Sequence, residues 1–180
     1  MKKTLRIVAA FLFAGTAFSA CSVKDDLSDT GSTGTSNFEV RLADNPATFT
    51  KVNIDIRSVM VNLTDDASNG WTTLNTNAGI YDLLTLQNGK DTLLAKGTLS
   101  AKTVKQIRFV LGTDNTVEAG SLTYPLTIPS GAESGLKINL SKDLTMPVES
   151  VVIDFDASAS IHQELDGSYT LRPVLIIRTK

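Results

Sequence analysis

The chain has 180 residues, and its 17 Lys and Arg against 19 Asp and Glu give a formal net charge of −2 at pH 7. A mildly acidic chain lacks the excess of basic residues that nucleic-acid binding requires, so DNA and RNA are not expected partners. One cysteine excludes an internal disulfide, and one cysteine with one histidine cannot supply the ligands of a zinc site.

The first 20 residues are typical of an export signal peptide. Lys2, Lys3 and Arg6 precede an apolar run over residues 7–18, and Ser19-Ala20 supplies the small residues of a cleavage site. The apolar run is about a dozen residues, whereas a membrane-spanning helix needs roughly 20. We expect residues 1–20 to be removed, which leaves 14 basic residues against 19 acidic ones and a net charge of −5.

The only cysteine, Cys21, would then become the first mature residue. Phe18-Ser19-Ala20-Cys21 resembles the bacterial lipobox, in which the cysteine sulfur receives a diacylglycerol, although Phe18 stands where Leu is usual. Each buried methylene of an acyl chain contributes about 0.8 kcal/mol, so several chains would anchor the protein to the membrane. The alternative is an unpaired cysteine beside a conventional cleavage site.

A short charged cluster, Lys24, Asp25 and Asp26, follows the cysteine. It resembles the acidic export signal of Bacteroidota-type lipoproteins, which implies display on the outer membrane, facing the cell exterior. A solvated charged tether is the alternative.

Residues from Leu27 to Ser36 have the Ser, Thr, Gly and Asp content of a flexible linker. We therefore divide the chain into a signal peptide at 1–20, a lipidated N-terminus and linker at 21–36, and a folded domain at 37–180. A domain of that length buries about two-thirds of its unfolded surface in one core, and no second linker divides it.

Alternating apolar residues predict β-strands almost throughout this domain, at 38–42, 52–56, 59–63, 107–111, 122–128, 136–140, 151–155 and 169–177. The alternation changes parity after Arg57-Ser58, which predicts a bulge or bend there. Pro173 predicts a free or bulged edge in the last strand. The spacing of Ile80, Leu83 and Leu84 suits one helical turn as well as a twisted strand.

Turn residues separate these runs, at Asp44-Asn45-Pro46, Ser68-Asn69-Gly70, Gln87-Asn88-Gly89, Pro129-Ser130-Gly131 and Asp166-Gly167. Short alternating strands with frequent turns predict an all-β fold, a single antiparallel β-sandwich or barrel.

The order of these motifs resembles the lipoprotein domain of unknown function 4382. The residues that carry the resemblance are Leu42-Ala43-Asp44-Asn45-Pro46, Trp71 with Leu74, Asp82-Leu83-Leu84 with Asn88-Gly89, Gln106-Ile107-Arg108, Pro129-Ser130-Gly131 with Ser134-Gly135-Leu136-Lys137, Asp154-Phe155-Asp156-Ala157 with Ser160-Ile161, and Leu171-Arg172-Pro173-Val174. Asn45 departs from the usual Ala. The resemblance implies an immunoglobulin-like or transthyretin-like sandwich on an exported lipoprotein, and it carries no catalytic residues.

The residues offer little support for catalysis. His162 is the only histidine that could activate a serine nucleophile, and no Gly-x-Ser-x-Gly motif occurs. We expect His162 to be an ordinary surface or loop residue, and we expect no enzyme activity and no cofactor.

Two aspartates suggest a metal site. Asp154 and Asp156 leave the same face of a strand, and Asp44-Asn45 or Asp65-Asp66 could reach them from loops, so calcium binding is one hypothesis. The alternatives are solvated carboxylates, carboxylates paired with Lys or Arg, and, less favoured, the acid and base of a glycosidase.

Aromatic side chains suggest a ligand platform. Trp71 and Tyr124, with Tyr81 and Tyr169, could stack against sugar rings, whereas packing of Trp71 over the core is the alternative. The leading hypothesis is a non-catalytic module that binds a glycan or a protein at the outer membrane. A structural or assembly component of an envelope or pilus-like complex, joined through strand edges near Pro173, is the alternative.

Overall fold

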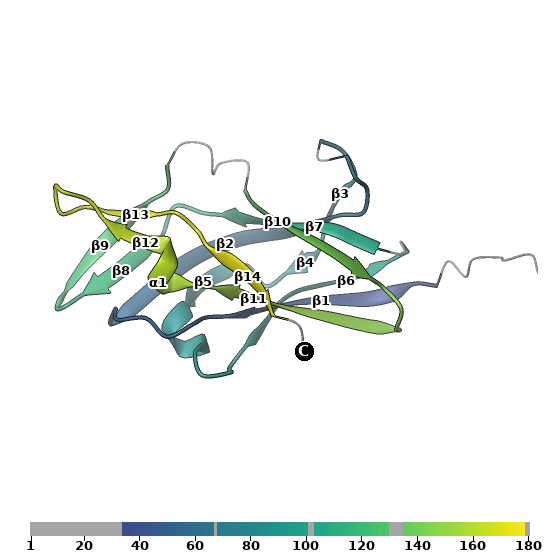
Figure 1. Cartoon of the computed structure of the whole chain (residues 1–180), viewed down its shortest axis with the longest axis horizontal. Coiled ribbons are helices and arrows are strands. Elements are labelled where there is room, and N and C mark those ends of the chain that lie inside the picture. Colours follow the sequence, from purple (N-terminus) through teal and green to yellow (C-terminus); the bar gives the residue numbers. More distant parts are fainter. Residues whose placement is uncertain (1–33, 67, 101–102, 130–134, 179–180) are drawn as a thin grey trace, which may run out of the picture. The chain divides into compact units, whose positions relative to one another are not determined.

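The structure, a computed structural model, describes residues 34–66, 68–100, 103–129 and 135–178 (Figure 1). The predictions made for the signal peptide, Cys21, Lys24, Asp25 and Asp26 lie outside these residues. In the described part of the chain, no helix is both long and apolar enough to cross a membrane.

Strands make up most of the described chain. In chain order the elements are β1 (Ser36–Ala43), β2 (Lys51–Asn62), β3 (Trp71–Thr73), β4 (Asn75–Thr76), β5 (Gly79–Asp82), the 3₁₀ helix η1 (Leu83–Leu86), β6 (Thr92–Leu99), β7 (Thr103–Leu111), β8 (Thr116–Ala119), β9 (Leu122–Thr127), β10 (Leu136–Asp143), β11 (Val148–Phe155), α1 (Ala157–Ser160), β12 (Ile161–Gln163), β13 (Tyr169–Leu171) and β14 (Leu175–Arg178).

The strands form two sheets that enclose one apolar core. The smaller sheet has the order β14-β11-β1-β6-β4; the larger has the order β10-β7-β2-β8-β9-β13-β12, and β3 and β5 also pair with β2 (Figure 1). The predicted all-β sandwich is therefore confirmed. The expectation of purely antiparallel sheets is wrong, because β1 runs parallel to β11 and β13 runs parallel to β9.

The chain connectivity allows the parallel pairs. A parallel pair needs a long connection, and most of the domain lies between β1 and β11. Alternation within 38–42 shows that one face of β1 is apolar, and Phe38, Val40 and Leu42 are indeed fully buried. The same alternation contains no information on the direction of the neighbouring strand.

The predicted parity change in β2 is confirmed. The pairing of β2 with β7 shifts register between Ile56 and Ser58. Because one extra residue is accommodated there, Ile54 and Ile56 before the shift and Val59 and Val61 after it all point into the core. One long strand thus replaces the two predicted strands.

Two predicted segments divide in the structure. The run at 169–177 becomes β13 and β14, which belong to different sheets, and Pro173 lies in the break between them. Of the ambiguous apolar residues, Ile80 lies in β5, whereas Leu83 and Leu84 lie in η1. Asp82 ends β5 and accepts a hydrogen bond from the Leu84 amide, which starts the 3₁₀ turn.

Strand β6 was not predicted. Leu93, Leu94 and Ala95 are consecutive apolar residues, and the pairing of β6 with β1 shifts register between Val40 and Arg41, so the alternation is interrupted. The short strands β3, β4, β8 and β12 have too few residues to establish a period.

Candidate functional site

The outer face of the larger sheet holds a cluster of polar side chains around Trp71. Register places Thr73, Met60, Arg108 and Lys137 in one cross-strand row over β3, β2, β7 and β10. The adjacent row contains Trp71, Asn62, Gln106 and Asn139. Since Ile107 and Phe109 are fully buried, their neighbours along β7 point to the opposite face, away from the core.

Trp71 and Arg108 form the centre of this cluster. The guanidinium carbon of Arg108 lies 3.9 Å from the centre of the Trp71 ring, and the Lys137 ammonium lies 5.9 Å from it. These distances are those of cation–π contacts. Trp71 is half-buried and does not belong to the core cluster of the sandwich.

Side-chain amides lie beside the two cations. The Gln106 amide nitrogen donates to the Asn139 amide oxygen at 2.7 Å. The Gln106 amide oxygen and the Arg108 Nε are buried and have no hydrogen-bond partner among the described residues. Asn62 is buried, its amide nitrogen donates to the Asp66 carbonyl, and its oxygen accepts from the Thr64 amide.

Among the described residues, no carboxylate balances the charge of the cluster. Arg108 and Lys137 are cross-strand neighbours, and neither takes part in an ion pair within the described part of the chain. Lys105, in contrast, pairs with Asp65 at 3.3 Å. Like charges directly opposite one another destabilise a sheet, so this pair costs free energy in the unliganded protein.

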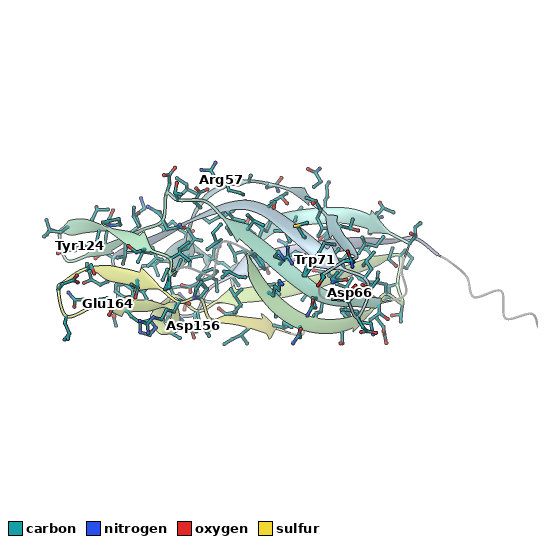
Figure 2. All side chains as sticks on the ribbon, turned by 90° about the horizontal axis from the view of Figure 1, so that it is seen from above. Arg57, Asp66, Trp71, Tyr124, Asp156 and Glu164 are labelled. Atoms are coloured by element: carbon teal, nitrogen blue, oxygen red, sulfur yellow. The ribbon has the colours of Figure 1, made fainter. Side chains whose placement is uncertain are left out.

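The predicted aromatic platform does not form as one surface. Tyr124 packs against the buried Tyr169, with ring centres 4.9 Å apart, and Tyr81 donates a hydrogen bond to the Asn77 carbonyl. Figure 2 shows Tyr124 well apart from Trp71. Burial raises the pKa of the Tyr81 hydroxyl. Of the four aromatics, only Trp71 belongs to the polar cluster.

Asp154 and Asp156 lie at the end of β11 and bind different protein groups. Asp154 is 2 % exposed and forms an ion pair with Arg178, whose Nε donates to it at 2.8 Å. Asp156 caps α1 by accepting from the Ala159 amide at 2.9 Å. The predicted reach of the 44–45 loop is confirmed, because the Asn45 amide donates to Asp156 at 3.4 Å.

Asp65 and Asp66 do not approach these carboxylates. Asp65 pairs with Lys105, and Asp66 accepts hydrogen bonds from the Ser68 amide and the Asn69 side chain. Those bonds lower the pKa of Asp66. His162 is exposed on β12.

Asp44 joins the carboxylates at the end of β11. It is fully buried, accepts from the Ala157 amide at 3.0 Å, and accepts from the Gln87 side chain at 3.0 Å. Burial raises its pKa; the two hydrogen bonds oppose the shift, and the charges of Asp154 and Asp156 add to it. Among the described residues, no group of three or more His, Cys, Asp or Glu is arranged to hold a metal ion. Calcium binding by Asp154 and Asp156 stays a prediction.

The comparison with protein families identifies the domain. A family model described as Domain of unknown function (DUF4382) matches residues 35–173. The chain belongs to this family. The DUF4382 match begins just before β1 and ends at Pro173, so it contains every strand except β14. No curated protein and no solved structure matches the chain.

Sequence reasoning found Trp71 but missed Arg108 and Lys137 as its partners. Both cations lie in motifs that carry the family resemblance, Gln106-Ile107-Arg108 and the stretch ending Leu136-Lys137. Alternation places each of them on the polar face of its strand. Only the register between β7 and β10 brings them together, and register cannot be read from either strand alone.

Proposed function

We propose that this DUF4382 protein is a lipid-anchored binding module of the outer membrane, displayed to the cell exterior, without catalytic activity of its own. The signal-like residues 1–20, Cys21 and the Lys24-Asp25-Asp26 cluster support the location. The proposal for the ligand is a glycan, bound on the outer face of the larger sheet.

One observation carries the choice of ligand: Trp71 lies outside the core, on the opposite face of the larger sheet, beside two cations and a row of side-chain amides. An indole has an apolar face for a sugar ring, and guanidinium and amide groups bind sugar hydroxyls. The neighbouring side chains here are mostly polar.

Display is tested by labelling intact cells with an antibody or by protease shaving. The wild-type protein is compared with a variant in which Lys24, Asp25 and Asp26 are replaced by Ala, and with Cys21→Ser. We expect labelling of the wild type and its loss in the triple variant. Absence of labelling in both would place the domain inside the envelope and contradict the proposal.

Binding is tested with a panel of neutral and acidic glycans. We expect retention on a subset of the panel and loss of that retention in Trp71→Ala. Ile80→Ala is the matched control, because Ile80 is an exposed apolar residue on β5 of the same sheet. A panel without any Trp71-dependent ligand would contradict glycan binding.

A second candidate function, assembly through strand addition, rests on the open side of the sandwich. Among the described strands, β14 pairs only with β11, and β10 ends the order of the larger sheet. A groove of about 460 Å³ is lined by residues of β10, β11 and β14 and by Met146, and two of its lining residues, Met146 and Val148, are 55 % and 52 % exposed. An extended segment of a partner could pair with β14 and cover this groove.

The backbone of β14 allows a specific test. The Asp156 amide donates to the Val174 carbonyl, so alternation directs the peptide groups of Leu175 and Ile177 to the free side. A strand partner should co-purify in fixed stoichiometry and be lost in Ile177→Pro, which removes an outward amide hydrogen. Val174→Ala should retain it. Retention by both variants would contradict strand addition.

A further inference from the structure

The ligand class can be narrowed from the charges on the outer face of the larger sheet, an inference that rests on the proposed glycan-binding function. We propose that the site takes an acidic glycan, with a carboxylate or sulfate group of the sugar bound between Arg108 and Lys137. The sugar ring then lies beside Trp71.

The first support is the unbalanced charge. Arg108 and Lys137 face one another across β7 and β10, and three acidic side chains that the structure describes in this region bind other groups. Asp65 pairs with Lys105, Asp66 accepts from Ser68 and Asn69, and Asp143 accepts from Thr103. An anion between the two cations would remove their repulsion and gain charge-assisted hydrogen bonds.

The second support is that Arg108 is held in place before any ligand binds. Its guanidinium stacks on Trp71, and its aliphatic stem lies against Gly135. Gly135 has φ +84°, and a Cβ there would lie 2.7 Å from Arg108 Cγ and 2.8 Å from the Phe109 carbonyl oxygen. Glycine therefore provides the space that the arginine stem occupies. An arginine fixed in this way loses little side-chain entropy on binding.

The neighbouring groups favour a sugar over other anions. The Gln106 and Asn139 amides lie in the next cross-strand row, where ring hydroxyls of a bound sugar would meet donors and acceptors. A nucleic acid would need a much longer row of cations, and the expected mature chain is acidic. The two cations could bind the anionic group of one charged sugar, and the indole could contact the ring of that sugar or of its neighbour in an oligosaccharide.

The test uses the full-length lipoprotein in detergent micelles and isothermal titration calorimetry. The probes are an oligogalacturonate, its fully methyl-esterified form, and a sulfated oligosaccharide of similar length. The ester keeps the ring and removes the charge. We expect the acid form or the sulfated form to bind, at least tenfold loss of affinity in the ester, and weaker binding at high salt.

The variants separate charge from fold. Lys137→Gln changes an exposed side chain and should lower affinity about tenfold, and Arg108→Gln should lower it at least as much. Lys96→Gln is the control, because Lys96 is an exposed lysine of β6 in the other sheet, also outside the ion pairs of the described residues. It should leave affinity unchanged.

Several results would overturn the inference. Equal affinity for the acid and its ester, or an unchanged affinity in Lys137→Gln, would show that charge does not select the ligand. If neutral glycans still bound in a Trp71-dependent way, the proposed glycan-binding function would stand although this inference had failed. Binding of a polyglutamate peptide as tightly as the acidic oligosaccharide would exclude a sugar-specific site. Absence of binding to all acidic probes would also overturn the inference.

Discussion

Glu149 is a buried carboxylate near the start of β11, and it binds the turn that connects β10 to β11. One of its oxygens accepts from the Thr145 amide at 3.0 Å, from the Thr145 hydroxyl at 3.1 Å and from the Met146 amide at 3.1 Å. The other oxygen lies 3.1 Å from the Lys142 ammonium. Burial would raise the pKa of Glu149, but these hydrogen bonds outweigh it, and the pKa lies below its ordinary value of 4.5.

Replacement Glu149→Gln should destabilise the protein in a pH-dependent way. At pH 7 we expect a loss of about 1–3 kcal/mol in the free energy of unfolding, because the charged acceptor is removed. A depressed pKa stabilises the fold above pH 4.5 and loses that contribution as pH falls through the folded-state pKa. Urea unfolding between pH 3 and 7 should therefore show the two proteins converging at acidic pH. A constant difference would contradict the assigned bonds.

Gly112 lies against a buried carboxylate. A Cβ there would overlap Oδ2 of Asp55 and Nε of Arg57, and the Nη2 atom of the same arginine pairs with Oδ2 of Asp55 at 2.6 Å. Gly112→Ala should therefore lower the free energy of unfolding by about 1–3 kcal/mol. Gly79→Ala is the control, since no atom lies within 4 Å of a Cβ at residue 79, and it should be neutral or raise stability by up to about 1 kcal/mol. Equal effects of both in thermal unfolding would contradict the overlap.

At the scale of single residues, the sequence indicates which side chains are polar but not which other side chains they contact. Asp154 was predicted on a strand face opposite the core, yet it is buried. Its strand lies between β1 and β14, and the Arg178 side chain reaches across to it. Trp71 was predicted as a platform or a core residue, and the decisive neighbour, Arg108, lies on another strand.

At the scale of elements, strong alternation located most of the longer strands. The parity change at Arg57-Ser58 predicted the register shift in β2. One inserted residue moves the apolar side chains that follow it to the other face of the strand, and this effect can be read from the local sequence. The segment 169–177 was wrongly predicted as one strand, because its division depends on distant parts of the chain and not on a local effect. Its alternation continues through Pro173, but the residues on either side pair with different sheets, and that choice depends on distant strands.

Strand β14 is attached to β11 by an ion pair as well as by backbone bonds. Arg178 pairs with the buried Asp154 and donates to the Asn45 side chain at 2.6 Å. Arg178→Met leaves the carboxylate buried and unpaired, so we expect a loss of about 1–3 kcal/mol in the free energy of unfolding, reduced by the partial exposure of Arg178.

Arg172→Met is the control for this prediction. Arg172 pairs with Glu164 at an exposed position, and the change should cost less than about 0.5 kcal/mol. Hydrogen exchange should show faster exchange at β14 in Arg178→Met alone. A similar effect of both substitutions would contradict the role assigned to the buried pair.

At the scale of the whole molecule, the all-β sandwich followed from short alternating strands, while its topology did not. The central position of β1, between β6 and β11, joins residues from both ends of the domain. In Figure 1 these three strands lie side by side. Such long-range pairing is specified by packing between distant segments, so residue patterns within one strand cannot reveal it.

This central position predicts where the domain can be shortened. Ser36 is buried and donates to the Met146 carbonyl at 2.6 Å, so the folded region includes the first residue of β1. A chain beginning at Gly34 keeps all of β1 and should unfold in one cooperative transition, because the described strands belong to one compact unit. A chain beginning at Leu42 lacks the buried Phe38 and Val40 and removes the strand that joins β6 to β11, so it should not fold. Both shortened chains can be tested by urea unfolding, with Trp71 fluorescence and circular dichroism as the two signals. Separate transitions in the longer chain would contradict a single folded domain, whereas a folded shorter chain would contradict the central role of β1.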